Sequence, residues 1–202
     1  MTIRSTERRV RLALFAAALV ASPGAAAAQA PAAPPRWEAG LALGYGTVEI
    51  TSREGRGGGR GALAMDFRIA RALARGTRVS VELGGWAMEY ANIWDPAKGE
   101  SVSGLSVGLQ VTPVRAWPLF VEAGAGLITY TNHHPLEFGS DGTGWRAAVG
   151  YEVALPASFV LVPSVQRSGG RLRDIRNALV SETGLGYSVT SVRVALLRRW
   201  GR

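Results

Sequence analysis

The sequence predicts an all-β fold, an eight-stranded antiparallel up-and-down β-barrel whose strands cross a lipid bilayer. Three observations predict it: side chains after residue 36 alternate between apolar and small or charged, connections alternate between long and short, and an export signal comes first. Successive side chains of a strand point to opposite faces of the sheet. A membrane barrel turns the apolar face outward and the polar face inward.

Residues 1–30 have the pattern of a secretory signal peptide. Four arginines precede an apolar run at 12–21, and Ala28 and Ala30 form a small-x-small cleavage site. We expect cleavage after Ala30, then a proline-rich lead-in at 31–36 and a barrel domain at 37–202. The apolar run is short for a membrane-spanning helix, which needs roughly 20 residues.

Charge and cysteine content narrow the function classes. The sequence has 23 Lys and Arg against 15 Asp and Glu. Four of the basic residues and one of the acidic residues lie in the predicted signal peptide, so the chain after cleavage has a net charge of about +5. No basic run interleaves with aromatic residues, so we expect no nucleic-acid partner. The sequence has no cysteine, which excludes disulfides, cysteine-ligated metals and a lipid anchor on cysteine.

Eight segments carry the alternation, and most have the roughly 9–11 residues that a tilted membrane strand needs. In chain order, the segments and their apolar-parity residues are 37–49 (Leu41, Leu43, Tyr45), 62–70 (Leu63, Met65, Phe67, Ile69), 77–88 (Val79, Val81, Leu83), 102–112 (Leu105, Val107, Leu109, Val111), 119–129 (Leu119, Val121, Ala123, Ala125, Leu127), 144–155 (Trp145, Val149, Tyr151, Val153), 159–167, and 188–200 (Val192, Val194, Leu196, Trp200).

Two of these segments are ambiguous. Residues 65–76 contain good helix formers and end on Gly76, which also suits a helix; their strictly alternating first half favours a strand with a turn after it. In the segment 159–167, both parities of residues 159–162 are apolar, so its facing is open.

The connections at 51–61, 91–101, 130–143 and 168–187 are long, and those at 71–76, 113–118 and 156–158 are short. Outer-membrane barrels have short periplasmic turns and long extracellular loops. An even number of strands then places both ends of the barrel on the periplasmic side.

These features resemble the small eight-stranded outer-membrane β-barrels, the family typified by the barrel domain of outer-membrane protein A and by outer-membrane protein X. The resemblance covers roughly residues 37–200 and is architectural. It implies a monomer in the outer membrane of a Gram-negative-type cell, inserted by the outer-membrane assembly machinery. Such chains usually end on an aromatic residue; here Gly201 and Arg202 follow Trp200, a departure in the assembly signal.

The residues predicted to face the barrel interior include charged side chains of both signs. The interior of an eight-stranded barrel is only wide enough for side chains to fill, and an isolated buried charge is very costly. We therefore expect a network that plugs the barrel, with a narrow gated pore as the alternative. The predicted network comprises Asp66, Arg68, Glu82, Glu122, Arg146, Glu152 and Arg193. Inward glycines such as Gly84, Gly108 and Gly124 would leave room for it.

Two further sets of residues suit a membrane surface. Trp37, Trp145 and Trp200 fall near predicted strand ends on the outward parity, which predicts an aromatic girdle at the lipid–water boundary. Arginines in the first and last long loops suit phosphate groups, so contact with lipopolysaccharide is a hypothesis; they are Arg53, Arg56, Arg60, Arg171, Arg173 and Arg176.

No catalytic, cofactor or metal site is expected. His133 and His134 lack the spacing of a metal motif, and Ser164 and Ser168 have no histidine near them for hydrolase chemistry. The sequence predicts a non-enzymatic barrel with a structural, adhesive or lipid-interacting role. The alternatives are a periplasmic lipocalin-like binder of an apolar ligand, a lipid A-modifying barrel enzyme, or the gated pore.

Overall fold

The structure is a computed structural model that describes residues 37–53, 55–74, 76–88, 99–114, 117–132, 138–176 and 181–201. The side chains of residues 55, 56, 138, 176, 181 and 182 are outside this description. So are the predicted signal peptide, the lead-in and His133-His134. Among the described residues, no helix is long and apolar enough to cross a membrane.

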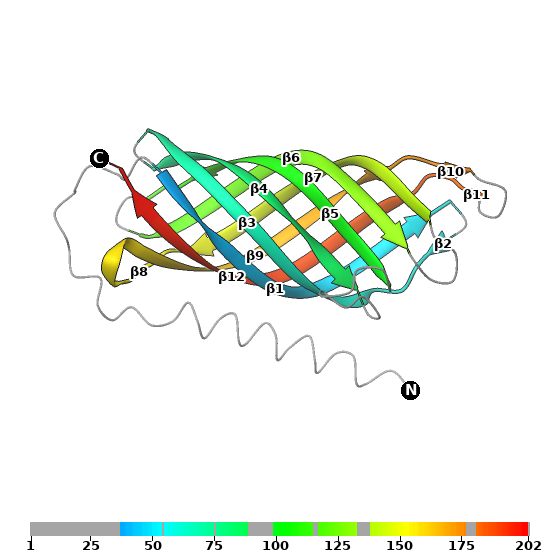
Figure 1. Ribbon diagram of the computed structural model, residues 1–202, viewed down its shortest axis with the longest axis horizontal. Coiled ribbons are helices and arrows are strands. Elements are labelled where there is room, and N and C mark those ends of the chain that lie inside the picture. The colour runs from blue at the N-terminus through cyan, green and yellow to red at the C-terminus, as the bar shows by residue number, and fades with distance from the viewer. Residues whose placement is uncertain are drawn as a thin grey trace. The chain divides into compact units, whose positions relative to one another are not determined.

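Eight long strands form a closed antiparallel barrel (Figure 1). They are β1 (Trp37–Ser52), β3 (Arg60–Ala74), β4 (Thr77–Met88), β5 (Glu100–Val111), β6 (Leu119–Asn132), β7 (Phe138–Tyr151), β9 (Phe159–Leu172) and β12 (Gly186–Trp200). Each pairs with the next long strand along the chain, and β12 pairs with both β9 and β1. The last pairing closes the barrel and confirms the predicted fold.

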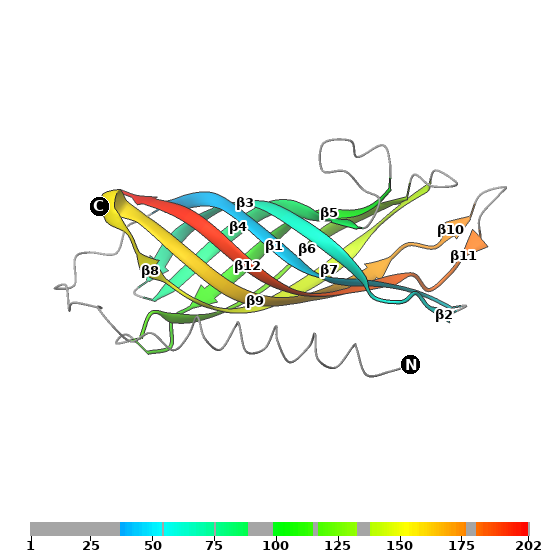
Figure 2. The same cartoon turned by 90° about the horizontal axis from the view of Figure 1, so that it is seen from below.

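Short elements lie at the two ends of the barrel (Figure 2). At the long-loop end, β2 (Gly55–Arg56) pairs with β1, and β10 (Ile175–Arg176) pairs with β11 (Ser181–Glu182). At the short-turn end, where the C-terminus lies, β8 (Val153–Ala154) pairs with β9, and the turn η1 (Pro156–Ser158) leads into β9. The predicted single strand at 144–155 is therefore wrong at its end, because β7 stops at Tyr151.

The strands run further towards the long-loop end than their apolar patterns predicted. β7 begins at Phe138 and β9 continues to Leu172. Threonine, serine and glycine replace the large apolar side chains there, while the ladder of backbone hydrogen bonds continues. The ambiguous segment at 65–76 belongs to β3 as far as Ala74, because pairing with β1 and β4 outweighs its local helix preference.

The barrel is staggered. Following paired residues from Arg198 in β12 through β1 and each later strand returns to β12 at Ser188, a stagger of ten residues. Such a stagger tilts the strands against the barrel axis. Residues in the middle of one strand therefore lie level with residues near the end of another.

The outer face of the barrel is apolar. Most of the predicted outward residues are exposed and none is buried; Leu43 is 64%, Val107 55% and Leu127 66% exposed. The ambiguous strand β9 turns Val160 and Val162 inward and Val165 outward. Water would disfavour so large a continuous apolar surface, whereas hydrocarbon accepts it.

Candidate functional site in the barrel interior

Arg146 on β7 holds the centre of an ion-pair network inside the barrel. Its guanidinium pairs with Glu82 on β4 and, at 2.7 Å, with Glu122 on β6. It also donates a hydrogen bond to Ser80 Oγ over 3.2 Å. One cation therefore joins strands from different parts of the barrel wall.

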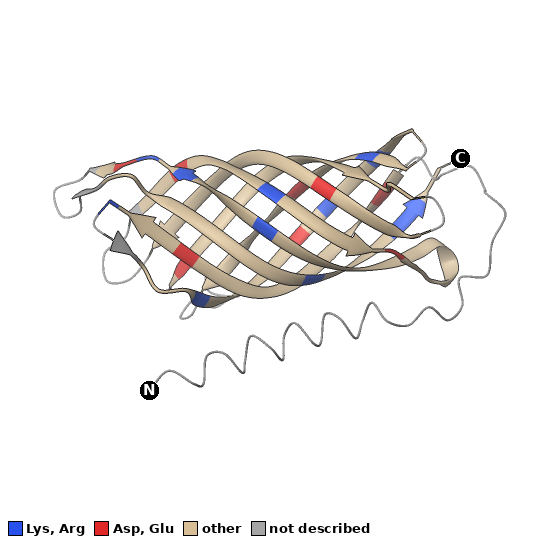
Figure 3. Ribbon diagram, turned by 180° about the vertical axis from the view of Figure 1, so that it is seen from behind, with Lys and Arg blue, Asp and Glu red and all other residues tan. Residues whose placement is uncertain are grey.

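Arg193 enters the same network from β12. Its guanidinium pairs with Asp66 on β3 and, at 2.7 Å, with Glu82, and it donates a hydrogen bond to Gln166 on β9. Because Glu82 forms ion pairs with both Arg146 and Arg193, these contacts cross the bore. Figure 3 marks the positions of the charged residues of both signs on the strands.

The network continues towards the short-turn end. Arg68 pairs with Glu122 at 2.7 Å and approaches Glu38 at 3.5 Å. Arg199 pairs with Glu38 at 3.0 Å and with Glu152 at 2.7 Å. Arg78 also forms an ion pair with Glu152, at 2.5 Å, at this end of the barrel.

The network is electrically balanced. All seven residues that the sequence predicted point inward and share it, joined by Glu38, Arg78 and Arg199, which the sequence analysis missed. Five carboxylates face five guanidiniums, and no side chain among them is more than 16% exposed. A buried carboxylate or guanidinium needs a partner of opposite charge, and each has one here.

Inward glycines make room for these side chains. A Cβ atom on Gly108 would lie 2.6 Å from Arg146 Nη2 and from Glu122 Oε1, and one on Gly124 would lie 2.9 Å from Arg146 Nε. A Cβ atom on Gly84 would likewise collide with the Asp66 carboxylate. Glycine at these positions therefore lets long charged side chains lie flat against the wall.

We expect Gly108→Val to destabilise the barrel by about 1–3 kcal/mol, because overpacking displaces the Arg146–Glu122 pair. The matched control is Ala123→Val, which adds bulk on the exposed outer face of the neighbouring strand. Urea unfolding of both variants in lipid vesicles measures the difference. Equal stabilities would show that Gly108 is not needed for the network.

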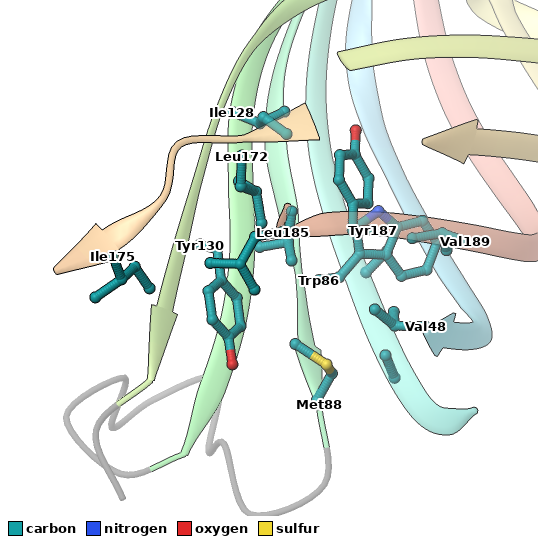
Figure 4. Packing of buried hydrophobic residues seen from close by; sticks show 13 residues of the cluster. Val48, Trp86, Met88, Ile128, Tyr130, Leu172, Ile175, Leu185, Tyr187 and Val189 are labelled. Atoms are coloured by element: carbon teal, nitrogen blue, oxygen red, sulfur yellow. The ribbon is translucent and has the colours of Figure 1, made fainter. Parts of the chain in front are cut away.

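Apolar clusters also line the interior of the barrel. Towards the long-loop end, 13 buried residues pack together, among them Val48, Trp86, Tyr130 and Tyr187 (Figure 4). Towards the short-turn end, Phe120, Val160, Val162 and Leu197 form a smaller cluster. The inward apolar residues Val160 and Val162 explain why β9 was ambiguous in the sequence.

A small cavity separates the network from the larger cluster. It has a volume of about 70 Å³, and its lining includes Asp66, Glu82, Arg146 and Arg193 on the charged side and Trp86 and Tyr187 on the aromatic side. This space suits a few buried waters. It is far below the roughly 300 Å³ at which small-molecule pockets begin.

Arg60 was predicted in a loop that faces the outer leaflet, and this placement is wrong. Arg60 begins β3, and its guanidinium pairs with Glu100 on β5 at 2.5 Å. It has the parity of the buried residues Ala62 and Ala64, so it points inward. Asn132 joins this pair by donating a hydrogen bond to Glu100 over 3.3 Å.

The other predicted loop arginines take different positions. Arg53 is exposed after β1, Arg171 is exposed on β9, and Arg173 is exposed directly after that strand. Arg56 and Arg176 lie in β2 and β10, and their side chains are outside the described part of the chain. Among the described residues, no cluster of His, Asp and Glu could hold a metal.

The three predicted girdle tryptophans are all exposed on the outer face. Trp37 pairs in register with Trp200 at the short-turn end, and the Arg71 guanidinium lies 5.4 Å from the centroid of the Trp37 ring. Trp145 lies in the middle of β7, not near its end as predicted. The stagger nevertheless brings it level with Tyr45, at the upper edge of the apolar band, by which we mean the edge of the apolar outer face that is nearer the long-loop end. The exposed Trp117, between β5 and β6, was missed.

The chain is similar in structure to known surface barrels of bacteria. No family model and no curated protein sequence matches it. Neisserial surface protein A superimposes with a TM-score of 0.52 and 10% identity, covering 78% of this chain and 96% of that one. The attachment invasion locus protein Ail of Yersinia pestis gives 0.43 and 8%, covering 80% and 99%, and OprG of Pseudomonas aeruginosa gives 0.41 and 10%, covering 84% and 97%.

A TM-score above 0.5 for the neisserial protein indicates a shared fold, while the two lower scores add nothing to the argument. At 10% identity the likeness concerns the fold alone. Together with the closed eight-stranded topology and the apolar exterior, it gives the chain the fold of the small eight-stranded outer-membrane β-barrels.

Proposed function

We propose that the protein is a monomeric, non-enzymatic barrel of the outer membrane whose interior is a structural plug. Its role, structural, adhesive or lipid-interacting, would then reside in its outer surface and its long-loop end. The observation that carries this proposal is the balanced network of five carboxylates and five guanidiniums across the bore.

The network argues against a pore. A passing ion would have to separate Glu82 from Arg146 and Arg193, which leaves buried charges without partners at a cost of several kcal/mol. The 13-residue apolar cluster lies beyond the network and presents no polar lining to a hydrated ion.

The outer face supports the membrane location over the lipocalin-like alternative. A soluble barrel that binds an apolar ligand needs polar residues outside and an apolar cavity inside, which is the reverse of this arrangement. Ser164 and Ser168 face the barrel interior, since their residue parity is that of the buried Val160 and Val162. That orientation gives no support to a lipid-modifying serine on the outer face.

Purified protein reconstituted in planar bilayers should give no large steady single-channel conductance. The protein should first be extracted from the envelope fraction with detergent and shown to migrate differently on gels before and after boiling, as folded barrels do. Steady conductance by folded wild-type protein would contradict the plugged interior. Release by osmotic shock without detergent would contradict the membrane location.

A further inference from the structure

The outer face of β9 carries a line of arginines that the network does not use. Arg167, Arg171 and Arg173 are exposed and share the outward parity of β9 and the residue that follows it. Gly169 lies between the first two, and a Cβ atom there would lie 3.5 Å from the ring atoms Cε2 and Cζ2 of Trp145. The Trp145 indole therefore packs over Gly169, with an arginine on either side of it along the strand.

This group, which we call the β9 arginine surface, lies at the upper edge of the apolar band. Trp145 is level with Tyr45 and close in height to Leu63 and Leu127. Nearer the long-loop end, the exposed outward residues become polar; they include Thr47, Ser103, Thr129, Thr143 and Thr190, and the acidic residues Glu49 and Asp141. Arg167 thus lies at the boundary and Arg171 beyond it.

The guanidiniums of this surface have no partner among the residues that the structure describes. Among the described residues, Arg167, Arg171 and Arg173 form no ion pair and no side-chain hydrogen bond, whereas every inward arginine is paired. Asp141 is next to Arg173 in the sheet, but its carboxylate accepts a hydrogen bond from Thr129 over 2.7 Å. Arg167 and Arg171 therefore offer the clearest anion sites.

We propose that the β9 arginine surface binds a phosphorylated glycolipid of the outer leaflet. Its acyl chains would lie on the apolar band, its sugar against the Trp145 ring, and its phosphates on Arg167 and Arg171. These arginines are four positions apart, a span of about 13 Å along a strand, which suits a disaccharide with a phosphate at each end. Guanidinium forks bind phosphate oxygens in pairs. The inference rests on the proposed membrane location, with the long-loop end outside.

The test uses folded, detergent-solubilised full barrel and native mass spectrometry, with lipid A carrying two phosphates as the probe. We expect wild type to bind it, and the double variant Arg167→Gln/Arg171→Gln to bind about tenfold more weakly, since two exposed ion pairs are lost. The matched control is Arg71→Gln/Arg198→Gln, which removes two exposed outward arginines at the short-turn end. It should bind like wild type.

Three further measurements test whether the bound molecule is the two-phosphate glycolipid, another lipid or free phosphate. Phosphate-free lipid A and phosphatidylglycerol should bind more weakly than the two-phosphate lipid, and millimolar inorganic phosphate should not displace that lipid. Equal loss in both double variants would overturn the proposal, as would equal binding of all three lipids or displacement by free phosphate. Each variant is first checked for the gel shift of a folded barrel, so a failed membrane location is distinguishable from a failed lipid site.

Discussion

Replacing Arg146 with methionine is expected to lower the free energy of unfolding by about 3–5 kcal/mol, the cost of leaving buried charges without a partner. Arg146 binds Glu82 and Glu122 at once, and its own side chain is 9% exposed. Methionine keeps much of the side-chain volume while it removes the charge. Urea titration of the barrel in lipid vesicles measures the change.

The double variant Glu122→Gln/Arg146→Met separates charge from volume. It removes one charge of each sign and keeps the interior neutral, so it should be more stable than Arg146→Met alone. Arg198→Met, on the exposed outer face, should change stability by no more than about 0.5 kcal/mol. A loss below about 1 kcal/mol for Arg146→Met would mean that the network contributes little to stability.

The alternation of side chains was sufficient to predict the fold and the charged residues in the middle of the strands. Asp66, Glu82 and Arg193 are flanked by large apolar residues, so their inward parity was evident. Glu38, Arg78 and Arg199 were missed because they lie near strand ends, where fewer neighbours establish the parity. All three lie inside the predicted segments, so following the same two-residue period to the ends of those segments would have found them.

Arg60 shows the opposite error. Its glycine-rich surroundings at 55–61 indicate a loop, and its pairing with Glu100 depends on β3 and β5, which are not neighbours in the sheet. No local pattern in the sequence records such a contact across the bore. Arg167 was overlooked for a related reason, since the facing of β9 was open until its pairing with β7 and β12 fixed it.

Height in the membrane was the least predictable quantity. Trp145 has seven or fewer strand residues on either side of it, so its sequence position gives no reason to place it at an interface. The ten-residue stagger supplies that reason, and it is a property of the closed barrel as a whole. Sequence reasoning placed Trp145 at a boundary through an incorrect strand start, and the stagger brings it to the edge of the apolar band.

A charge on the outer face should test the bilayer directly. Val107 on β5 is 55% exposed, and the paired residues Val81 and Ala125 face outward beside it. The stagger places it within the apolar band, below the level of Trp145. We expect Val107→Arg to cost about 2–4 kcal/mol in lipid vesicles, the range for arginine facing the middle of a bilayer.

Ser103→Arg is the matched control, because Ser103 is exposed on the same face of the same strand, four residues nearer the long-loop end. It lies above the apolar band, so arginine there should cost no more than about 1 kcal/mol. In detergent micelles, which adapt to a protruding side chain, the gap between the two variants should shrink. The outer face of a soluble barrel meets water along its whole length, so both variants would then lose similar amounts of stability. The difference between Val107→Arg and Ser103→Arg therefore reports whether hydrocarbon surrounds the apolar band.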